Sequence, residues 1–199
     1  MKKLLIPIIA ALAVGCGNKT QTGFTISGQI DGLNSDSVWL FARQYDSEPT
    51  AAAAVKKGAF KLEGVATEPS LGYIVSRSGM VCDLVVENGN IVIKRTGQGA
   101  DDIEITGTPA NDAVTRDFAR LTEQFKGVPC EDSQRQQELI TKLWEEGAKA
   151  NRDNFYGVLC ITNLMERIPI EQLHKLYDGL SPKMRLTEGA ASVLSFFDD

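Results

Sequence analysis

The chain has 199 residues, of which 43% are hydrophobic and 24% are charged, and its formal net charge is −5. This is an ordinary globular composition with room for one domain or two small ones. The acidic balance, with no basic cluster after Lys3, argues against the clustered positive surface of a nucleic-acid-binding protein, so no nucleic-acid partner is expected.

The first 15 residues have the pattern of a secretory signal. Lys2 and Lys3 supply a positive start, and an apolar run follows at residues 4–14, broken by Pro7. The run is about half of the roughly 20 apolar residues that a membrane-spanning helix needs. The pattern therefore predicts a signal peptide at residues 1–15 and not a membrane span.

The end of this run resembles the bacterial lipoprotein box. It reads Leu-Ala-Val-Gly-Cys at residues 12–16, with Gly15 and Cys16 in their usual places and Ala13 where leucine is more common. In that family a peptidase cuts before the cysteine, whose sulfur carries a diacylglycerol. The resemblance implies lipid attachment at Cys16, and the alternative is an ordinary signal with a chance cysteine.

Residues 16–23 are polar and glycine-flanked, which predicts a flexible tether between the anchor and the first domain. Gly17 stands where an aspartate would, in some Gram-negative bacteria, favour retention in the inner membrane. No acidic run of the kind found in surface-export signals follows Cys16. The expected location is therefore the cell envelope, on the outer membrane and facing the periplasm, with the membrane as a partner through the lipid.

Residues 24–107 carry the signals of short strands separated by glycine turns. The expected strands lie at residues 24–30, 38–42, 59–63, 73–76, 81–86, 91–94 and 103–106. Such spacing is typical of an antiparallel sandwich or a barrel-like domain. Asn88-Gly89 is a strong signal for a tight hairpin between two of these strands.

Residues 108–199 change to helical periodicity, so the predicted fold class is α+β. Thr108 is a residue type that caps helices, and Pro109 follows it, as at many helix starts. Apolar residues then recur on one face at helical spacing. The expected helices lie at residues 109–125, 132–151, 154–168 and 171–177, with a weaker one after Pro182.

The cysteines allow few disulfide pairings. If Cys16 is lipidated, Cys82, Cys130 and Cys160 remain, and an odd number allows at most one internal disulfide. An oxidising periplasm permits a bridge. The pairing considered is Cys130 with Cys160, and the alternative is that the thiols stay free and buried.

Other candidate sites are few. Alternation places Trp39 and Phe41 on one side of their strand, where they serve either as a ligand platform or as core. The single histidine, His174, offers no evident catalytic triad, and zinc needs three or four suitable ligands. The sequence predicts no cofactor, no metal site and no catalytic residue.

Several motifs in order resemble a known module. They are Gly28, the Lys-Gly-x-Phe turn ending at Phe60, Glu68-Pro69 with Tyr73, Glu87-Asn88-Gly89, and the helix start at residues 106–111. The sequence of the helical part agrees as well. Over residues 24–186 the chain resembles a domain of unknown function found in periplasmic lipoproteins. In that family an AhpC/TSA-type thioredoxin-like domain usually follows, and its redox chemistry uses a Cys-x-x-Cys motif.

No Cys-x-x-Cys motif occurs in this chain, so none of the family's redox residues carries over. The expected function is a membrane-anchored bacterial lipoprotein that acts as a non-catalytic binding or scaffold module. One alternative is an accessory or truncated N-terminal domain of a thiol–disulfide exchange system, with a thioredoxin-like periplasmic partner. Another is glycan or peptide capture.

Overall fold

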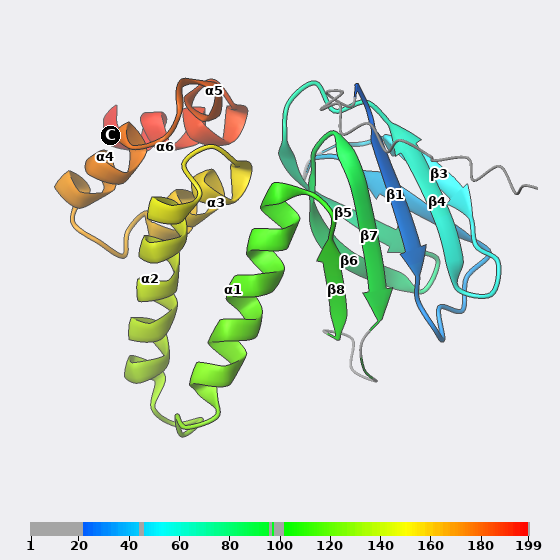
Figure 1. Ribbon diagram of the computed structural model, residues 1–199, viewed down its shortest axis with the longest axis horizontal. Helices are drawn as coiled ribbons and strands as arrows, with labels where there is room; N and C mark the ends of the chain where they lie inside the picture. Colours follow the sequence, from blue (N-terminus) through cyan, green and yellow to red (C-terminus); the bar gives the residue numbers. More distant parts are fainter. Residues whose placement is uncertain (1–21, 44–45, 96, 98–101, 199) are drawn as a thin grey trace, which may run out of the picture.

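The computed structural model describes residues 22–43, 46–95, 97 and 102–198. A two-sheet β-sandwich is followed by a group of helices, which confirms the α+β class (Figure 1). The predicted signal peptide, the lipid-attachment candidate Cys16 and the tether as far as residue 21 lie outside the described residues. The strands are β1 (Phe24–Gln29), β2 (Ser37–Phe41), β3 (Ala51–Ala54), β4 (Ala59–Gly64), β5 (Ser70–Ser76), β6 (Gly79–Val86), β7 (Gly89–Arg95) and β8 (Ile103–Thr106).

The strands form two four-stranded sheets. Sheet A has the order β4-β1-β7-β8, and sheet B has the order β3-β2-β5-β6. All neighbours are antiparallel except β1 and β7, which pair in parallel. Alternate residues of each strand enter the core between the sheets, as the period of two requires. The largest fully buried side chains of this core include Ile26, Leu40, Leu62, Ile74 and Ile91.

One turn with a hairpin signal connects the two sheets instead. Asn88-Gly89 leads from β6 in sheet B to β7 in sheet A, so the predicted hairpin there is wrong. The Asn88 side chain explains the departure, because it bonds both the N–H and the C=O of Ala66 on another loop. The turn at Lys57-Gly58 forms a tight two-residue hairpin: both residues have positive φ (52° and 78°), and Lys56 and Ala59 exchange two backbone hydrogen bonds (2.9 and 3.0 Å). Beyond this pair, β3 and β4 run in different sheets.

The helices are α1 (Pro109–Phe125), α2 (Ser133–Ala150), α3 (Phe155–Leu164), α4 (Ile170–Asp178), α5 (Pro182–Arg185) and α6 (Glu188–Asp198). The predicted third helix is too long, because the chain turns extended at Met165 (ψ 137°). The weak last helix is in fact two, α5 and α6.

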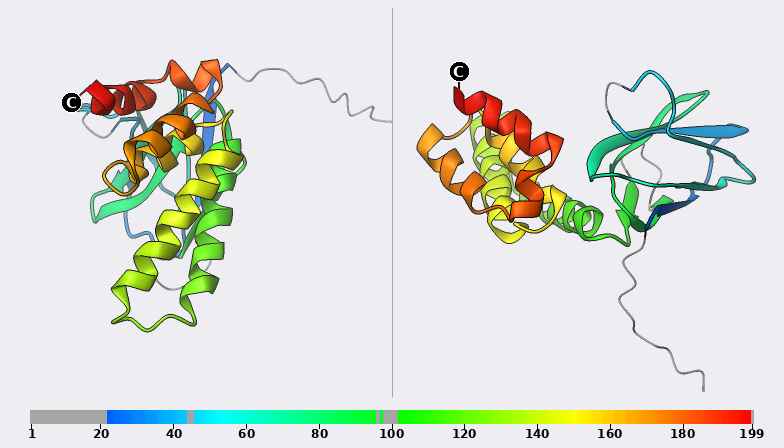
Figure 2. Two further views of the ribbon diagram at one scale, coloured as in Figure 1. Left: turned by 90° about the vertical axis from the view of Figure 1, so that its left-hand side faces the viewer. Right: turned by 90° about the horizontal axis from the view of Figure 1, so that it is seen from above.

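The helical part has its own core around α3. Seven of the ten residues of α3 are buried, and α2, α4 and α6 pack around it (Figure 2). The apolar face predicted for α1 is not fully covered, since Phe118 is 60% exposed. Among the described residues no helix is long and apolar enough to cross a membrane.

Candidate functional site

Asn111 joins the helices to the edge of sheet B. Its side chain accepts a hydrogen bond from the N–H of Val85 (3.0 Å) and donates one to the C=O of Val85 (2.8 Å). Asn111 is 2% exposed, and its amide also donates to the Thr108 hydroxyl. An edge strand presents unpaired backbone groups. Here a side-chain amide takes the place of the next strand at this position of β6.

Glu87 and Thr115 complete the attachment of α1. The Glu87 carboxylate accepts a hydrogen bond from the N–H of Ala110 in the first turn of α1, where an acidic group also favours the helix dipole. Thr115 donates its hydroxyl to the C=O of Ile105 in β8 (2.6 Å). Helix α1 is therefore bonded to the edge strands of both sheets and closes this side of the sandwich (Figure 1).

Glu68 makes a second link between the two halves. One carboxylate oxygen lies 3.1 Å from Arg43, and the other accepts a hydrogen bond from the N–H of Glu188 at the start of α6. The Arg43 guanidinium also lies 3.2 Å from the Glu188 carboxylate. The Glu-Pro motif thus serves as an N-terminal cap for a helix 120 residues away in the chain.

The outer faces of the two sheets differ in chemistry. On sheet A most outward residues are polar or charged, for example Ser27, Lys61, Glu63 and Lys94. On sheet B most of them are apolar; Ser37 and Asp83 also point outward, and Asp83 is the one charged residue in its four strands. We use the name aromatic face for six of its outward apolar side chains, which are Trp39, Phe41, Leu71, Tyr73, Val75 and Met80.

The structure places the predicted platform residues Trp39 and Phe41 on this aromatic face and not in the core. Val38 and Leu40 of the same strand point inward and are fully buried, whereas Trp39 and Phe41 are partly exposed. The ring of Phe41 stacks on that of Tyr73, its partner in β5, at 5.1 Å and 8°. Since these two rings face each other, they do not present the open pair of ring faces on which a sugar would stack.

The three thiols outside the signal region are free. Cys130 is exposed, Cys82 is partly buried and Cys160 is buried, so the structure does not form the considered Cys130–Cys160 bridge. Cys130 precedes α2, whereas the Cys160 sulfur lies beside Gly147, near the far end of that helix. At about 1.5 Å of rise per residue these sites are on the order of 20 Å apart. A disulfide needs Cα atoms within about 7 Å.

Cys160 belongs to a buried polar cluster with Asp117 of α1 and Tyr156 of α3. A Cβ atom at Gly147 would lie 2.7 Å from the Cys160 sulfur, 3.2 Å from the Tyr156 ring and 3.4 Å from an Asp117 carboxylate oxygen. Gly147 therefore provides the space in which the three groups meet. Burial raises the pKa of the Cys160 thiol to about 12, opposed by its contact with Tyr156 and assisted by the Asp117 charge. Such a thiol is not a nucleophile at neutral pH.

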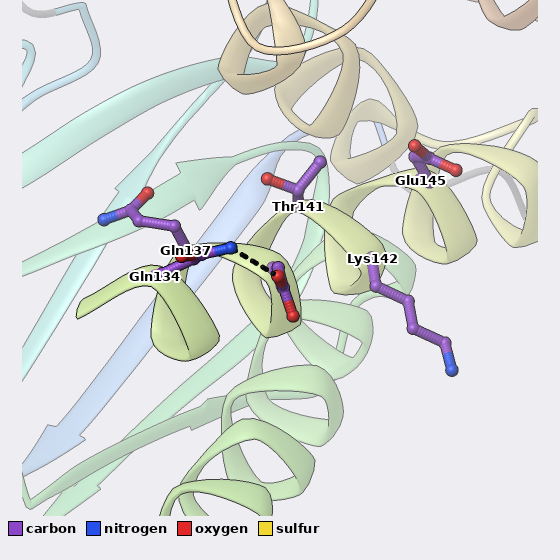
Figure 3. A pocket seen from close by; sticks show the side chains of 6 residues that line it. Gln134, Gln137, Thr141, Lys142 and Glu145 are labelled. Atoms are coloured by element: carbon purple, nitrogen blue, oxygen red, sulfur yellow. Dashed lines mark hydrogen bonds between the residues drawn. The ribbon is translucent and has the colours of Figure 1, made fainter. Parts of the chain in front are cut away.

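The surface hollows of the helical part are shallow and mixed in charge. One of about 440 Å³ lies along α2 between Gln134 and Glu145, and its polar side chains extend over the surface of that single helix (Figure 3). Another, of about 300 Å³, lies between α1 and α2 and is lined by Asp117, Arg120 and Glu146 among others. Arg120 and Glu146 pair with each other at 2.9 Å. Within the described residues no group of His, Cys, Asp and Glu side chains is arranged to hold a metal ion.

Comparison with known protein families matches residues 24–114 to a domain of unknown function (DUF4369). Residues 24–114 are a DUF4369 domain. The match takes in all eight strands and the first turns of α1, so Asn111 belongs to the DUF4369 domain although it lies in a helix. It ends well before residue 186, where the resemblance noted from the sequence ends. No curated protein matches the chain.

Four residues of these motifs make structural contacts. Asn111, Glu87, Asn88 and Glu68 bond backbone groups that close or connect elements. The family resemblance pointed to these residues, but their roles could not be predicted from the sequence. A side chain that bonds the backbone of a distant segment produces no periodic pattern in the sequence. The aromatic face was signalled by the alternation of Trp39 and Phe41, while Met80 and Leu71 were missed.

Proposed function

We propose that this protein is a membrane-anchored bacterial lipoprotein that acts as a non-catalytic binding or scaffold module in the cell envelope. The observation that carries the proposal is the use of four motif residues: Asn111, Glu87, Asn88 and Glu68 each bond backbone groups of another element. The lipoprotein box at Cys16 supports the anchor. The aromatic face of sheet B supports a binding role, since aromatic residues and Met are enriched at protein interfaces.

The anchor is tested by expressing the full chain and the variant Cys16→Ala in a bacterium fed a labelled fatty acid. We expect label and membrane fractionation for the parent chain, because several acyl chains hold a protein far more firmly than one. The variant should lose the label. A parent chain that carries no label and is recovered in the soluble periplasmic fraction would contradict the anchoring half of the proposal.

A redox accessory role is the second candidate, and the exposed thiol of Cys130 is what favours it. In that case the pure protein, mixed with a thioredoxin-like protein, should exchange disulfides at a rate that Cys130→Ser abolishes. A binding or scaffold module predicts no turnover above that of the thioredoxin-like protein alone. Cys82→Ser serves as the matched control, because the Cys82 thiol is partly buried and burial raises its pKa to about 12.

A further inference from the structure

The Asn88-Gly89 pair, the one Asn-Gly dipeptide in the sequence, carries a chemistry of its own. Glycine has no Cβ atom to shield its backbone nitrogen, so an asparagine before it reacts readily with the chain itself. The glycine nitrogen attacks the side-chain carbonyl carbon and forms a C–N bond. The bond from that carbon to the amide nitrogen breaks, and ammonia leaves with the proton of the glycine N–H. Water then opens the cyclic imide to an aspartate or an isoaspartate.

In the folded protein both reacting groups are bonded to other segments. The Asn88 side-chain oxygen accepts a hydrogen bond from the Ala66 N–H (2.9 Å), and its nitrogen donates one to the Ala66 C=O (2.8 Å). The Gly89 N–H donates to the C=O of Gly23 (3.1 Å) as β7 begins. The attacking nitrogen must leave Gly23, and the carbonyl that it attacks must leave Ala66, before the two can meet.

Hydrogen bonding, and not burial, holds these groups apart. Asn88 is exposed, so water reaches its side chain in the folded state. The preceding residue, Glu87, accepts a hydrogen bond from the N–H of Ala110 (2.9 Å). Residues 87–89 are thus bonded to three separate segments at the crossing from sheet B to sheet A.

We infer that Asn88 is a deamidation site, protected while its link to Ala66 is closed and reactive once the link opens. Loops of a folded protein open locally at a lower free energy than the whole domain unfolds. Water is the co-reactant that the reaction needs. The inference concerns how long the folded state lasts and does not depend on the anchor or on a binding partner.

The product does not restore the link. An aspartate at this position has two acceptor oxygens and no N–H, so one oxygen faces the Ala66 C=O without a hydrogen bond. An isoaspartate adds one atom to the backbone that crosses from β6 to β7. A chain that has reacted therefore opens more readily, and the opening becomes irreversible.

The test follows the full chain at 37 °C and pH 8, folded and in a urea concentration that unfolds it. Peptide mass spectrometry locates each gain of about one mass unit. Asn34, which is exposed and precedes Ser35, is the internal control. We expect Asn88 to react at least tenfold faster in urea than in the folded protein, and the rate at Asn34 to change less than threefold. Equal rates at Asn88 in both conditions, or no reaction there in urea, would overturn the inference.

A variant tests the effect of the product on the link. Asn88→Asp supplies the aspartate directly, and Asn34→Asp adds the same charge in another exposed segment as the matched control. We expect hydrogen exchange at the Ala66 N–H to become several-fold faster in Asn88→Asp and to stay unchanged in Asn34→Asp. Exchange at Ala66 that is equal in Asn88→Asp and the parent would refute the claim that the modified chain opens more readily.

Discussion

At the residue scale, side chains that bond distant backbone groups carry much of the architecture. Asn111 supplies both partners that Val85 would otherwise find in a neighbouring strand. Gly28 lies under the ring of Phe60, its partner in β4, where a Cβ atom would come within 2.1 Å of the ring. Little freedom for substitution remains at Asn111 and Gly28, because each fits closely against the backbone or ring of another strand.

Replacing Asn111 by Ala should destabilise the protein strongly. The change leaves the N–H and C=O of Val85 buried without their partners, which costs about 2–3 kcal/mol of unfolding free energy. Urea denaturation should show a lower midpoint with an unchanged slope. Asn163→Ala is the control, because the exposed Asn163 amide bonds the C=O of Leu159 within its own helix. Equal midpoints for the two variants would contradict the role assigned to Asn111.

Stability should fall as pH rises above about 9 through the buried thiol of Cys160. Its pKa is raised from 9.0 to about 12 in the folded protein, so above pH 9 the unfolded chain loses a proton that the folded chain retains. Fewer bound protons in the unfolded state mean that stability decreases with pH. Urea midpoints at pH 8 and pH 10.5 should differ less in Cys160→Ala than in the parent. Cys130→Ala should retain the full difference, and a Cys160→Ala variant that does the same would refute this assignment.

At the element scale, α1 and α6 are positioned by contacts with the sandwich. Helix α1 meets the edges of both sheets, and the first N–H of α6 is bonded to Glu68 of a sandwich loop. The helical part is therefore attached at two separate points.

Glu68→Ala should loosen the start of α6. The variant removes the acceptor of the Glu188 N–H and one partner of Arg43. Loss of a capping acceptor costs on the order of 1 kcal/mol. Hydrogen exchange at residues 188–191 should become several-fold faster while α3 is unchanged. Glu63→Ala, which removes an exposed pair with Lys61, is the matched control and should leave α6 as it is.

The predicted elements show where local pattern is sufficient. Strands with clear alternation, such as β1 and β4, and helices with a proline at the start, such as α1, were expected close to their observed bounds. Strand β3 was missed because alanine has no strand preference, and it forms through pairing with β2. The crossing at Asn88-Gly89 was misread because the choice of sheet depends on the distant Ala66. The aromatic face could be predicted only in part. Alternation shows which side chains share a face of a strand, but the packing of the core decides which face points outward.

At the scale of the whole molecule, the sandwich and the helices share side chains. Val85 of β6 is part of the helical core, and Asn111 of α1 completes the edge of sheet B. Two packed units joined in this way should lose their structure together.

Trp39 lies in the sandwich and Trp144 in the helical part, so each reports on one half. Trp39→Phe and Trp144→Phe each leave one fluorophore for urea denaturation. We expect the two fluorescence transitions to coincide with each other and with far-ultraviolet circular dichroism. Midpoints separated by more than the fitting error would show that the two halves unfold independently. That result would contradict the account in which side chains shared by the sandwich and the helices couple their unfolding.

The measurement that tests the central claim most directly is the thiol state of the protein in its own membranes. Cells are quenched in acid, free thiols are alkylated, and the affinity-purified chain is analysed by mass spectrometry. A non-catalytic binding module predicts that Cys82, Cys130 and Cys160 are all recovered as alkylated free thiols. Recovery of Cys130 in a mixed disulfide with a thioredoxin-like protein would contradict the account and assign the protein to thiol–disulfide exchange.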